Sequence, residues 1–339
     1  MATFERRQGF WRVKVRRAGF PAQSRSFDNK ALAQTWAREV ESKMDRGDFV
    51  DRSEADRYTL GDVLRRYAAE VSPTKKGQAS EELHIRSILR YEVCQYRMSV
   101  LKSAQIAEFR DQRSRKVATS TVNRELTILS HAIETARREW DVYMAENPVS
   151  RVRRLKAPPP RTRRLSPEEE RSLLAACAQS RGQFLVPAVR VALETAMRRG
   201  EIVRIERRHI DLFNSVLLLP DTKNGSPRAV PLSDVAKEII RKVLVAMPDI
   251  GDGLLFSGVT SNALDLAFTR ALRRAGIKDF HFHDLRHEAT SRFHEKGLNP
   301  IEVMSVTGHK SMASMLRYSH VRGLEVTRKL NNPIPGGQP

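Results

Sequence analysis

The chain is poor in cysteine and in long apolar runs. It has only two cysteines, Cys94 and Cys177, far apart in 339 residues, and no Cys/His spacing typical of a metal site. This pattern predicts a reduced compartment and no bound metal. No apolar run approaches the length of a membrane span, and the first residues, MATFERRQGFWRVKVRR, lack the apolar core of a signal peptide. We therefore expect a soluble, cytoplasmic protein with no membrane partner.

Acidic residues are also few beside the basic ones. The chain has 60 Lys and Arg against 40 Asp and Glu, a formal net charge of +20 and a pI near 10.5. A folded chain this basic is expected to bind a polyanion, most often nucleic acid, although a generally basic surface is the alternative. Because 40% of the residues are apolar, the chain is long and apolar enough for two or three folded domains.

Residues 1–57 are predicted to form a small strand-and-helix module. Apolar and basic residues alternate over 10–17, as in a half-buried strand with one cationic face. A second strand ends near Phe27, and a helix is expected to begin after a cap at Asp28 or Asn29. We interpret the module as a DNA-binding unit, and its candidate contacts are Arg12, Lys14 and Arg16.

Residues 58–150 are predicted to be helical. Amphipathic patterns begin at Thr59, Ser80 and Ser103. The longest pattern, TSTVNRELTILSHAIETARREW, spaces its apolar residues for one buried face. Four helices with short connections favour a compact bundle.

Residues 151–164 are predicted to be an extended linker. The run contains three consecutive prolines and seven basic residues with no acidic one. Proline makes such a segment semi-rigid, and its charge favours contact with a phosphate backbone over a plain tether. The candidate DNA contacts here are Arg153, Arg154, Arg163 and Arg164.

Residues 165–330 are predicted to form an α-rich domain with a small β hairpin, followed by a flexible tail over 331–339. Ser166 is the expected N-cap of its first helix, with Pro167 at the first position and Glu169 completing a capping box. An apolar strand from Val216 to Leu219 and a second from Arg228 to Leu232 are joined by an Asn-Gly turn. The fold class expected for the whole chain is mainly α and multidomain.

Four short motifs in this last domain carry chemistry. They are ETAMRRGEI, TKNG, HFHDLRH and TGHKSMASMLRYSH. Each is weak alone, because surface arginines, structural histidines, Asn-Gly turns and exposed tyrosines are common. Their candidate catalytic residues, in chain order, are Arg198, Lys223, His283, Arg286, His309 and Tyr318.

Taken together, the order Arg, Lys, His-x-x-Arg, Gly-His, Tyr resembles the tyrosine recombinase (phage integrase) family. The resemblance is close from Leu165 to about Leu330 and looser in the two upstream domains. It implies that residues 1–57 are an arm-type DNA-binding module and residues 58–150 a core-binding domain. TKNGSPRAVPL and HFHDLRHEATSRF are near-complete forms of the family's signatures. The residues of LETAMRRGEI and HFHDLRHEA are most similar to those of shufflon-type DNA invertases. One departure is Ala196, where most members carry glycine, a small cost unless the position needs a positive φ.

Phosphodiester cleavage explains why these residue types occur together. It requires a nucleophile, stabilisation of a charged phosphorane-like state and a proton for the leaving oxygen. Tyr318 is the expected nucleophile, and Lys223 at a hairpin tip is the expected general acid. Two arginines can each grip non-bridging oxygens bidentately, which fits Arg198 and Arg286.

The remaining roles are assigned on the same grounds. His309 is expected to donate a hydrogen bond to the phosphate, and His283 to accept the proton of the tyrosine. By the resemblance, Glu201 orients its active-site neighbours, while His287 is expected to be structural. The sequence shows no EF-hand, carboxylate cluster or Walker loop, so we expect no metal, ATP or other cofactor.

The resemblance implies a site-specific recombinase acting on double-stranded DNA. Four protomers would assemble on two sites and exchange strands through a 3′-phosphotyrosine and a Holliday junction, with accessory DNA-bending proteins as possible partners. A type IB topoisomerase and a non-catalytic DNA-binding regulator are the alternatives. Inversion, integration and excision use the same residues, so the sequence leaves the reaction's direction and the target site open.

Overall fold

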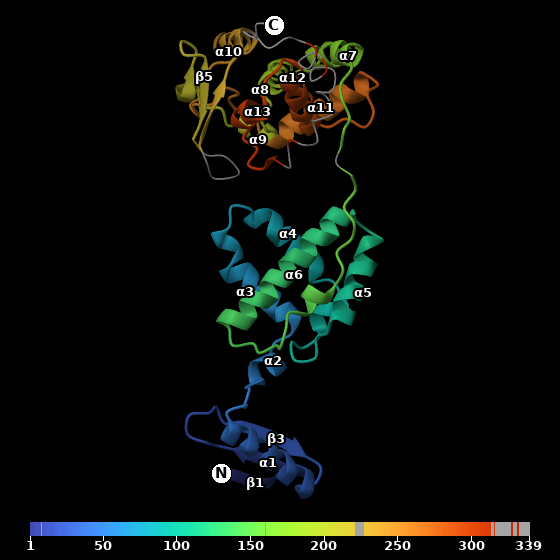
Figure 1. Cartoon of the computed structure of the whole chain (residues 1–339), viewed down its shortest axis with the longest axis vertical. Helices are drawn as coiled ribbons and strands as arrows, with labels where there is room; N and C mark the ends of the chain where they lie inside the picture. The colour runs from blue at the N-terminus through green and yellow to red at the C-terminus, as the bar shows by residue number, and fades with distance from the viewer. Residues whose placement is uncertain are drawn as a thin grey trace. The chain divides into compact units, whose positions relative to one another are not determined.

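The computed structural model describes residues 1–7, 9–159, 161–220 and 227–312, together with residues 315, 327 and 331. The chain divides into two compact units, residues 1–159 and 160–339 (Figure 1). Both are mainly helical with small antiparallel sheets, which confirms the predicted fold class. The predicted domain boundaries at residues 57, 150 and 164 subdivide these units and stay predictions.

The first unit begins with a three-stranded antiparallel sheet of β1 (Ala2–Arg7), β2 (Phe10–Val15) and β3 (Gln23–Phe27). Helix α1 (Lys30–Arg46) packs against the sheet and is capped by the side chain of Asn29. Val13 and Val15 are fully buried, whereas Arg12 on the alternate position of β2 is exposed. The cationic strand was predicted, but β1 was not.

The rest of the first unit is a helical bundle with its own hydrophobic core. The longest helix buries Val122, Leu126, Leu129 and Ile133 on one face, as its apolar spacing predicted. The helices are α2 (Ser53–Arg57), α3 (Leu60–Glu70), α4 (Gln78–Ile88), α5 (Ser103–Ser114) and α6 (Thr119–Glu139), with short 3-10 turns η1 (Ser72–Thr74), η2 (Glu92–Gln95) and η3 (Pro148–Arg151).

The second unit surrounds one large apolar core with helices. Its first helix, α7 (Pro167–Ala178), has the predicted capping box, in which the Ser166 hydroxyl accepts from the Glu169 N–H at 3.1 Å. The other helices are α8 (Leu185–Thr195), α9 (Arg199–Ile202), α10 (Asp234–Ala246), α11 (Ser261–Arg274), α12 (Phe282–Glu295) and α13 (Pro300–Thr307), with the 3-10 turn η4 (Arg207–His209).

A small sheet lies at one edge of this unit (Figure 1). Its antiparallel strands are β4 (Ile210–Asp211), β5 (Val216–Leu219) and β6 (Arg228–Pro231). β5 and β6 form the predicted hairpin strands, while the predicted Asn224-Gly225 turn lies outside the described residues. β6 also contacts α13, and α12 packs against both α8 and α13. The end of α8, the start of α12 and the end of α13 are thereby brought together.

Within the described part of the chain, no helix has the length and apolar character needed to cross a lipid bilayer.

Candidate active site

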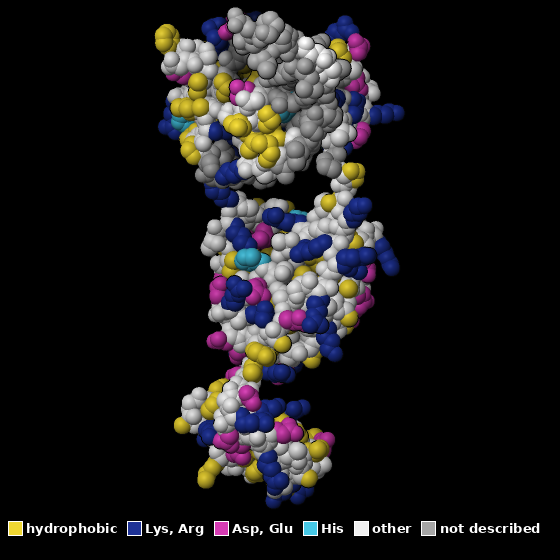
Figure 2. Space-filling model, in the orientation of Figure 1, with side chains coloured by type: hydrophobic (Ala, Val, Ile, Leu, Met, Phe, Trp, Pro, Cys, Tyr) yellow, Lys and Arg dark blue, Asp and Glu magenta, His cyan; other side chains and the backbone are white. Residues whose placement is uncertain are grey.

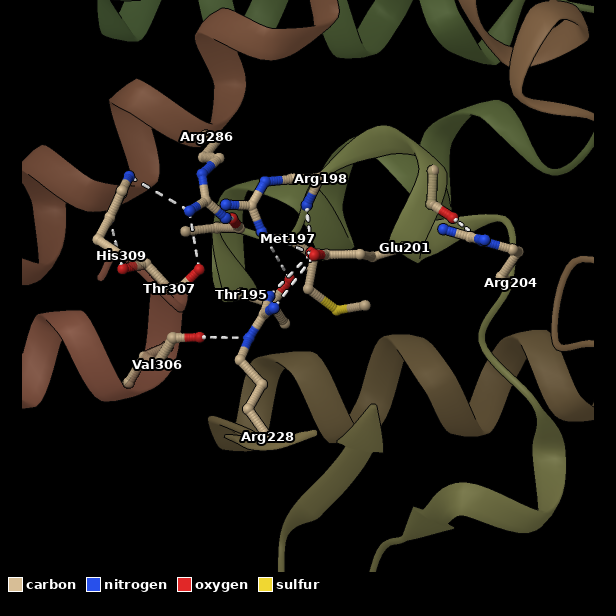
Figure 3. Close-up of polar contacts among 12 residues, drawn as sticks. Thr195, Met197, Arg198, Glu201, Arg204, Arg228, Arg286, Val306, Thr307 and His309 are labelled. Carbon is tan, nitrogen blue, oxygen red and sulfur yellow. Dashed lines mark hydrogen bonds and ion pairs between the residues drawn. The ribbon is translucent and has the colours of Figure 1, made fainter. Parts of the chain in front are cut away.

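Arg198 stands at the start of α9, where its backbone and side chain both bind Glu201. The Arg198 N–H donates to Glu201 Oε2 at 2.8 Å, and Nη1 donates to Oε1 at 2.8 Å. Glu201 is only 3% exposed. A buried carboxylate with two fixed donors holds the guanidinium in one orientation (Figure 3). The predicted orienting role of Glu201 therefore has a direct structural basis.

Arg228 completes this cluster, and the sequence interpretation missed it. Its Nη1 and Nη2 donate to the two oxygens of Glu201 at 3.1 and 2.8 Å, and Nε donates to the Val306 carbonyl at 3.3 Å. A Cβ added at Gly308, whose φ is +72°, would lie 3.0 Å from Arg228 Nη1. Arg228 thus ties strand β6 to Glu201 and to the end of α13. Its only sequence signal was a cation at the start of an otherwise apolar strand.

Burial alone would raise the pKa of the Glu201 carboxyl, but hydrogen bonds and charge from Arg228 and Arg198 lower it to about 2. The folded-state pKa therefore lies below the roughly 4.3 of an unfolded glutamate. The ionised carboxylate stabilises the folded protein above that pH. This contribution is lost as the pH falls from about 4 toward 2.

Arg228→Met is expected to destabilise the folded chain. The loss of stability on acidification should also begin at a higher pH, because Glu201 keeps only Arg198. Removing one partner of a buried pair costs about 3–5 kcal/mol, and we expect the lower end here. Chemical denaturation between pH 3 and 7 measures both effects. The matched control is Arg241→Met, since Arg241 is 58% exposed and binds exposed Glu238. Equal stability of the two variants would contradict the assignment.

Helix α8 ends at Ala196, which adopts a left-handed conformation with φ 52° and ψ 22°. The sequence predicts a small cost for alanine unless the position needs a positive φ, and the structure shows that it does. The left-handed region costs a residue with a Cβ about 1–2 kcal/mol. Ala196 is fully buried, and its carbonyl accepts a 2.7 Å hydrogen bond from Arg286 Nη1. The strained turn therefore positions Arg198, which follows it, and Arg286, which binds its carbonyl.

Ala196→Gly is expected to stabilise the protein by about 1 kcal/mol, raising the Tm by about 2–4 °C, because glycine adopts this conformation without strain. Calorimetry of the full chain measures the change. Ala192→Gly is the matched control: Ala192 is equally buried but lies within α8. There glycine should destabilise by about 1 kcal/mol. A lower Tm for Ala196→Gly would show that the turn carries no strain.

Arg286 is buried at 2% exposure on α12 and is held by backbone carbonyls. Besides Ala196, its Nη2 donates to the Thr307 carbonyl at 2.7 Å and lies 3.3 Å from His309 Nε2. Arg198, Arg286 and His309, predicted from three separate motifs, therefore meet at one place (Figure 3).

The tautomer of His309 follows from its neighbours. The single hydroxyl hydrogen of Thr307 goes to the Val303 carbonyl at 2.7 Å, so the Thr307 oxygen accepts from His309 Nδ1, also at 2.7 Å. This assignment puts the proton on Nδ1 and leaves Nε2 to accept from Arg286. Thr307 is a second residue that sequence reasoning missed. It aims the Nε2 edge of His309 at Arg286.

His283 lies on the first turn of α12, and its ring contacts His287 edge to face with centroids 5.1 Å apart. Its surface remains partly exposed. Partial burial, together with the charges of His287, Arg286 and Arg198, lowers the pKa of His283 to about 4. His283 is therefore neutral at pH 7 and able to accept a proton. His283 lies three positions before Arg286 on α12 and so shares a helix face with it, while the contact with His287 fits the structural role expected of that residue.

Two predicted catalytic residues, Lys223 and Tyr318, lie outside the described residues. Lys223 falls between β5 and β6, and Tyr318 follows α13 in the sequence. Their roles stay predictions. Among the described residues no group of His, Cys, Asp and Glu is arranged to hold a metal ion.

The predicted DNA contacts fall into two groups. Arg12 and Arg16 are exposed and Lys14 is half-buried in the first module, and Arg153 and Arg154 are exposed at the end of the first unit. Arg163 and Arg164 instead bind carboxylates of the second unit: Arg163 binds Glu169, and Arg164 binds Glu288 and Glu295. Contact with DNA stays a prediction for all seven residues.

The second unit matches the model of the phage integrase family over residues 163–324, and residues 56–156 match that of the phage integrase N-terminal domain. A shufflon-specific DNA recombinase of Escherichia coli is 39% identical over 282 residues, which cover 80% of this chain and 72% of that protein. An integrase/recombinase of Haemophilus influenzae is 31% identical over 324 residues, covering 92% and 85%. The chain belongs to the phage integrase family, the tyrosine-type site-specific recombinases.

Solved structures share the fold at low sequence identity. A lambda integrase tetramer bound to a Holliday junction matches with a TM-score of 0.64 and 21% identity, covering 91% of this chain and 95% of that chain. The Tn1549 transposon integrase in complex with circular intermediate DNA matches with a TM-score of 0.65 and 19% identity, covering 77% and 95%.

Proposed function

We propose that this recombinase cleaves and rejoins duplex DNA at specific sites through a 3′-phosphotyrosine formed on Tyr318. The observation that carries the proposal is the gathering of Arg198, Arg286 and His309 from three segments of the chain. Each is fixed by neighbours before any substrate binds. Preorganised donors of this kind stabilise charge that develops on a phosphate in the transition state.

The proposed cleavage step uses neither a metal nor a nucleotide cofactor. The Tyr318 oxygen bonds to phosphorus as the bond to the 5′-oxygen breaks, and the tyrosine proton passes to neutral His283. Lys223 gives a proton to the departing 5′-oxygen. Arg198 and Arg286 hold the non-bridging oxygens. A 5′-hydroxyl of another strand then attacks the phosphotyrosine, releases Tyr318 and reseals the DNA.

His309 must change its proton arrangement to take part. With the proton on Nδ1, its Nε2 edge accepts from Arg286 and cannot donate. A phosphate that draws the Arg286 Nη2 donor to itself would free Nε2 to take up a proton and donate to a phosphate oxygen. The Thr307 hydroxyl keeps the ring in the orientation that this requires.

The partner we propose is double-stranded DNA carrying paired recombination sites. The relative from Escherichia coli is named a shufflon-specific DNA recombinase, which favours inversion between inverted sites. The lambda integrase tetramer on a Holliday junction is the basis for proposing four protomers on two sites. Accessory DNA-bending proteins would then select the direction of the reaction. A protein with this substrate would work in the cytoplasm, on the nucleoid.

Charge over the molecule supports extended contact with DNA. Lys and Arg side chains are scattered over the visible face of the N-terminal module and the helical bundle, among fewer Asp and Glu side chains (Figure 2). In the module, the open face of β2 presents Arg12 and Lys14. Lys14 is paired with Thr3 on β1 and Ser24 on β3, and Arg12 with Glu5 and Ser26. A cation flanked by hydroxyls, as Lys14 is, is suited to phosphate contacts. We propose that this face binds DNA outside the exchange site.

Replacing Arg12, Lys14 and Arg16 together with glutamine is expected to flatten the salt dependence of DNA binding. Each lost phosphate contact reduces the slope of log K against log salt by about 0.9. Cleavage of a nicked suicide substrate should stay measurable, as it should after deletion of residues 1–57. Fluorescence anisotropy at several salt concentrations measures the slope. An unchanged slope would show that the face does not contact DNA.

The function is tested with supercoiled plasmids that carry two inverted sites, one site or none. The sites are taken from inverted repeats beside the gene. A recombinase inverts the segment only in the two-site plasmid. Relaxation of every plasmid without inversion would favour the topoisomerase alternative. Binding with no covalent protein–DNA adduct on nicked DNA would favour the non-catalytic regulator.

A further inference from the structure

The second unit begins with a basic stretch, residues 161–165, that runs along helix α12. Arg161 Nε and Nη2 donate to the two oxygens of Asp284, each at 3.1 Å. Its Nη1 and Nη2 also bind the Asp279 side chain and carbonyl, at 2.9 and 2.7 Å. Asp284 is 1% exposed, and the two hydrogen bonds from Arg161 compensate the charge of its buried carboxylate.

Arg164 repeats this arrangement one helical turn further along. Its Nε and Nη2 donate to the two oxygens of Glu288 at 3.0 and 2.9 Å, and the Leu165 N–H donates to Glu288 at 3.1 Å. Glu288 is 2% exposed and also accepts from Arg292 at 2.8 Å. Arg164 additionally binds Glu295 near the end of α12. The linker therefore holds α12 along most of its length.

The same helix carries two catalytic candidates. Asp284 lies between His283 and Arg286, and its carboxylate also accepts the His281 N–H at 2.8 Å to begin the helix. A carboxylate four positions before Glu288 shares a face with it. A shift of Asp284 would therefore move the turn that carries His283 and Arg286. Misplacement of a catalytic group by about 1 Å can cost 10²-fold in rate.

These contacts compete with any role of the two arginines at DNA. A guanidinium has five N–H donors, and in both side chains all three nitrogens are already directed at carboxylate or carbonyl oxygens. To bind a phosphate bidentately, Arg161 or Arg164 would have to give up its two-pronged contact with a buried carboxylate, which is unfavourable even at Glu288, where Arg292 would remain. The chain that connects the two units would then lose its attachment to α12.

We propose that Arg161 and Arg164 are positioning residues for the reaction: with Asp284 and Glu288 they form a linker clasp that orients the catalytic turn of α12. Asp284 and Glu288, and not the phosphate backbone, are their partners when DNA is bound. The proposal rests on the proposed function, because its main readout is DNA cleavage. It separates Arg161 and Arg164 from Arg153 and Arg154, which precede the clasp.

Single-turnover cleavage of a nicked substrate by the full chain at saturating protein tests the clasp. Arg161→Gln and Arg164→Gln should slow cleavage about 10- to 100-fold, with DNA affinity within twofold and an unchanged salt slope. Arg161→Lys keeps the charge but loses the planar fork, so it should also be slow. Arg171→Gln is the matched control, because it removes the same charge from a side chain that is 76% exposed on α7.

The outcomes separate the competing roles. A fall in salt slope of about 0.9 per arginine with an unchanged cleavage rate would identify phosphate contacts and overturn the proposal. An unchanged cleavage rate together with an unchanged salt slope would contradict the proposal and show that residues 161–165 only connect the two units. Full activity of Arg161→Lys would show that charge alone suffices. Pairing Arg164→Gln with Glu288→Gln should slow cleavage no further than the single changes do, and additive losses would contradict a shared contact.

Hydrogen exchange of α12 provides a readout that does not depend on activity. Amides of residues 282–295 should exchange faster in Arg161→Gln than in the unaltered chain, and at the unaltered rate in Arg171→Gln. Absence of any covalent adduct with the unaltered chain would contradict the proposed function. Unaltered exchange in Arg161→Gln would contradict the clasp, whatever the activity.

Discussion

Tyr318→Phe is expected to abolish formation of the covalent protein–DNA adduct while leaving DNA affinity within about twofold. Only the hydroxyl is lost, so contacts made by the ring and by the rest of the chain remain. Loss of a nucleophile reduces such reactions by at least about 10⁴-fold. Denaturing gels of a nicked suicide substrate measure the adduct, and anisotropy measures the affinity.

Tyr143→Phe is the matched control, since Tyr143 is a partly exposed tyrosine of the first unit. It should form the adduct at the unaltered rate. An adduct of normal yield from Tyr318→Phe would mean that another residue attacks the phosphate. Loss of affinity together with loss of the adduct would instead assign Tyr318 to binding.

The described part of the site explains how a tyrosine could react near neutral pH. A free phenol is a weak nucleophile because its pKa is about 10. His283, with a pKa of about 4, is neutral and able to take the proton as attack proceeds. In the proposed mechanism, Arg198 and Arg286 stabilise the negative charge on the phosphate. Both arginines are already held in place, Arg198 by Glu201 and Arg286 by the carbonyls of Ala196 and Thr307.

Lys223→Ala is expected to slow cleavage by about 10²–10⁴-fold at saturating protein, as loss of a general acid does. Lys223 lies outside the described residues, in the connection between β5 and β6. The expectation depends on the leaving 5′-oxygen, which needs a proton. A substrate with sulfur at the 5′-bridging position has a leaving group that needs none. Lys223→Ala should cut that substrate almost as fast as the unaltered enzyme does.

Arg198→Ala is the control for this rescue. In the proposed mechanism its side chain stabilises charge and donates no proton to the leaving group, so the variant should stay slow on the sulfur substrate. If sulfur does not rescue Lys223→Ala, the proton comes from elsewhere. If Lys223→Ala cuts normally at saturating protein and only its affinity falls, Lys223 is a DNA contact.

Local patterns predicted the regular elements well. The capping box at Ser166, the buried face of α6 and strand β5 each depend on residues within a few positions of one another, which a sequence displays directly. β1 was missed because ATFERR has few apolar residues to alternate, and β4 because it is two residues long. Short elements such as these are stabilised by neighbouring strands and not by their own pattern.

The interactions that organise the site had no such pattern. Arg228 and Glu201 are 27 positions apart, and Arg161 and Asp284 are 123 apart. Nothing near either arginine in the sequence distinguishes a partner carboxylate from a DNA phosphate. This is why Arg163 and Arg164 were predicted to contact DNA, although both bind acidic residues of the second unit. The sequence also left the φ of Ala196 open, because alanine itself does not indicate a positive φ.

The central claim is that the Arg198, Arg286 and His309 cluster serves a strand transfer through Tyr318. Digestion of the covalent adduct of the unaltered chain, followed by peptide mass spectrometry, tests this most directly. The account predicts a nucleotide joined by its 3′-phosphate to the peptide that contains Tyr318. A nucleotide on any other residue, or one joined through its 5′-phosphate, would contradict it.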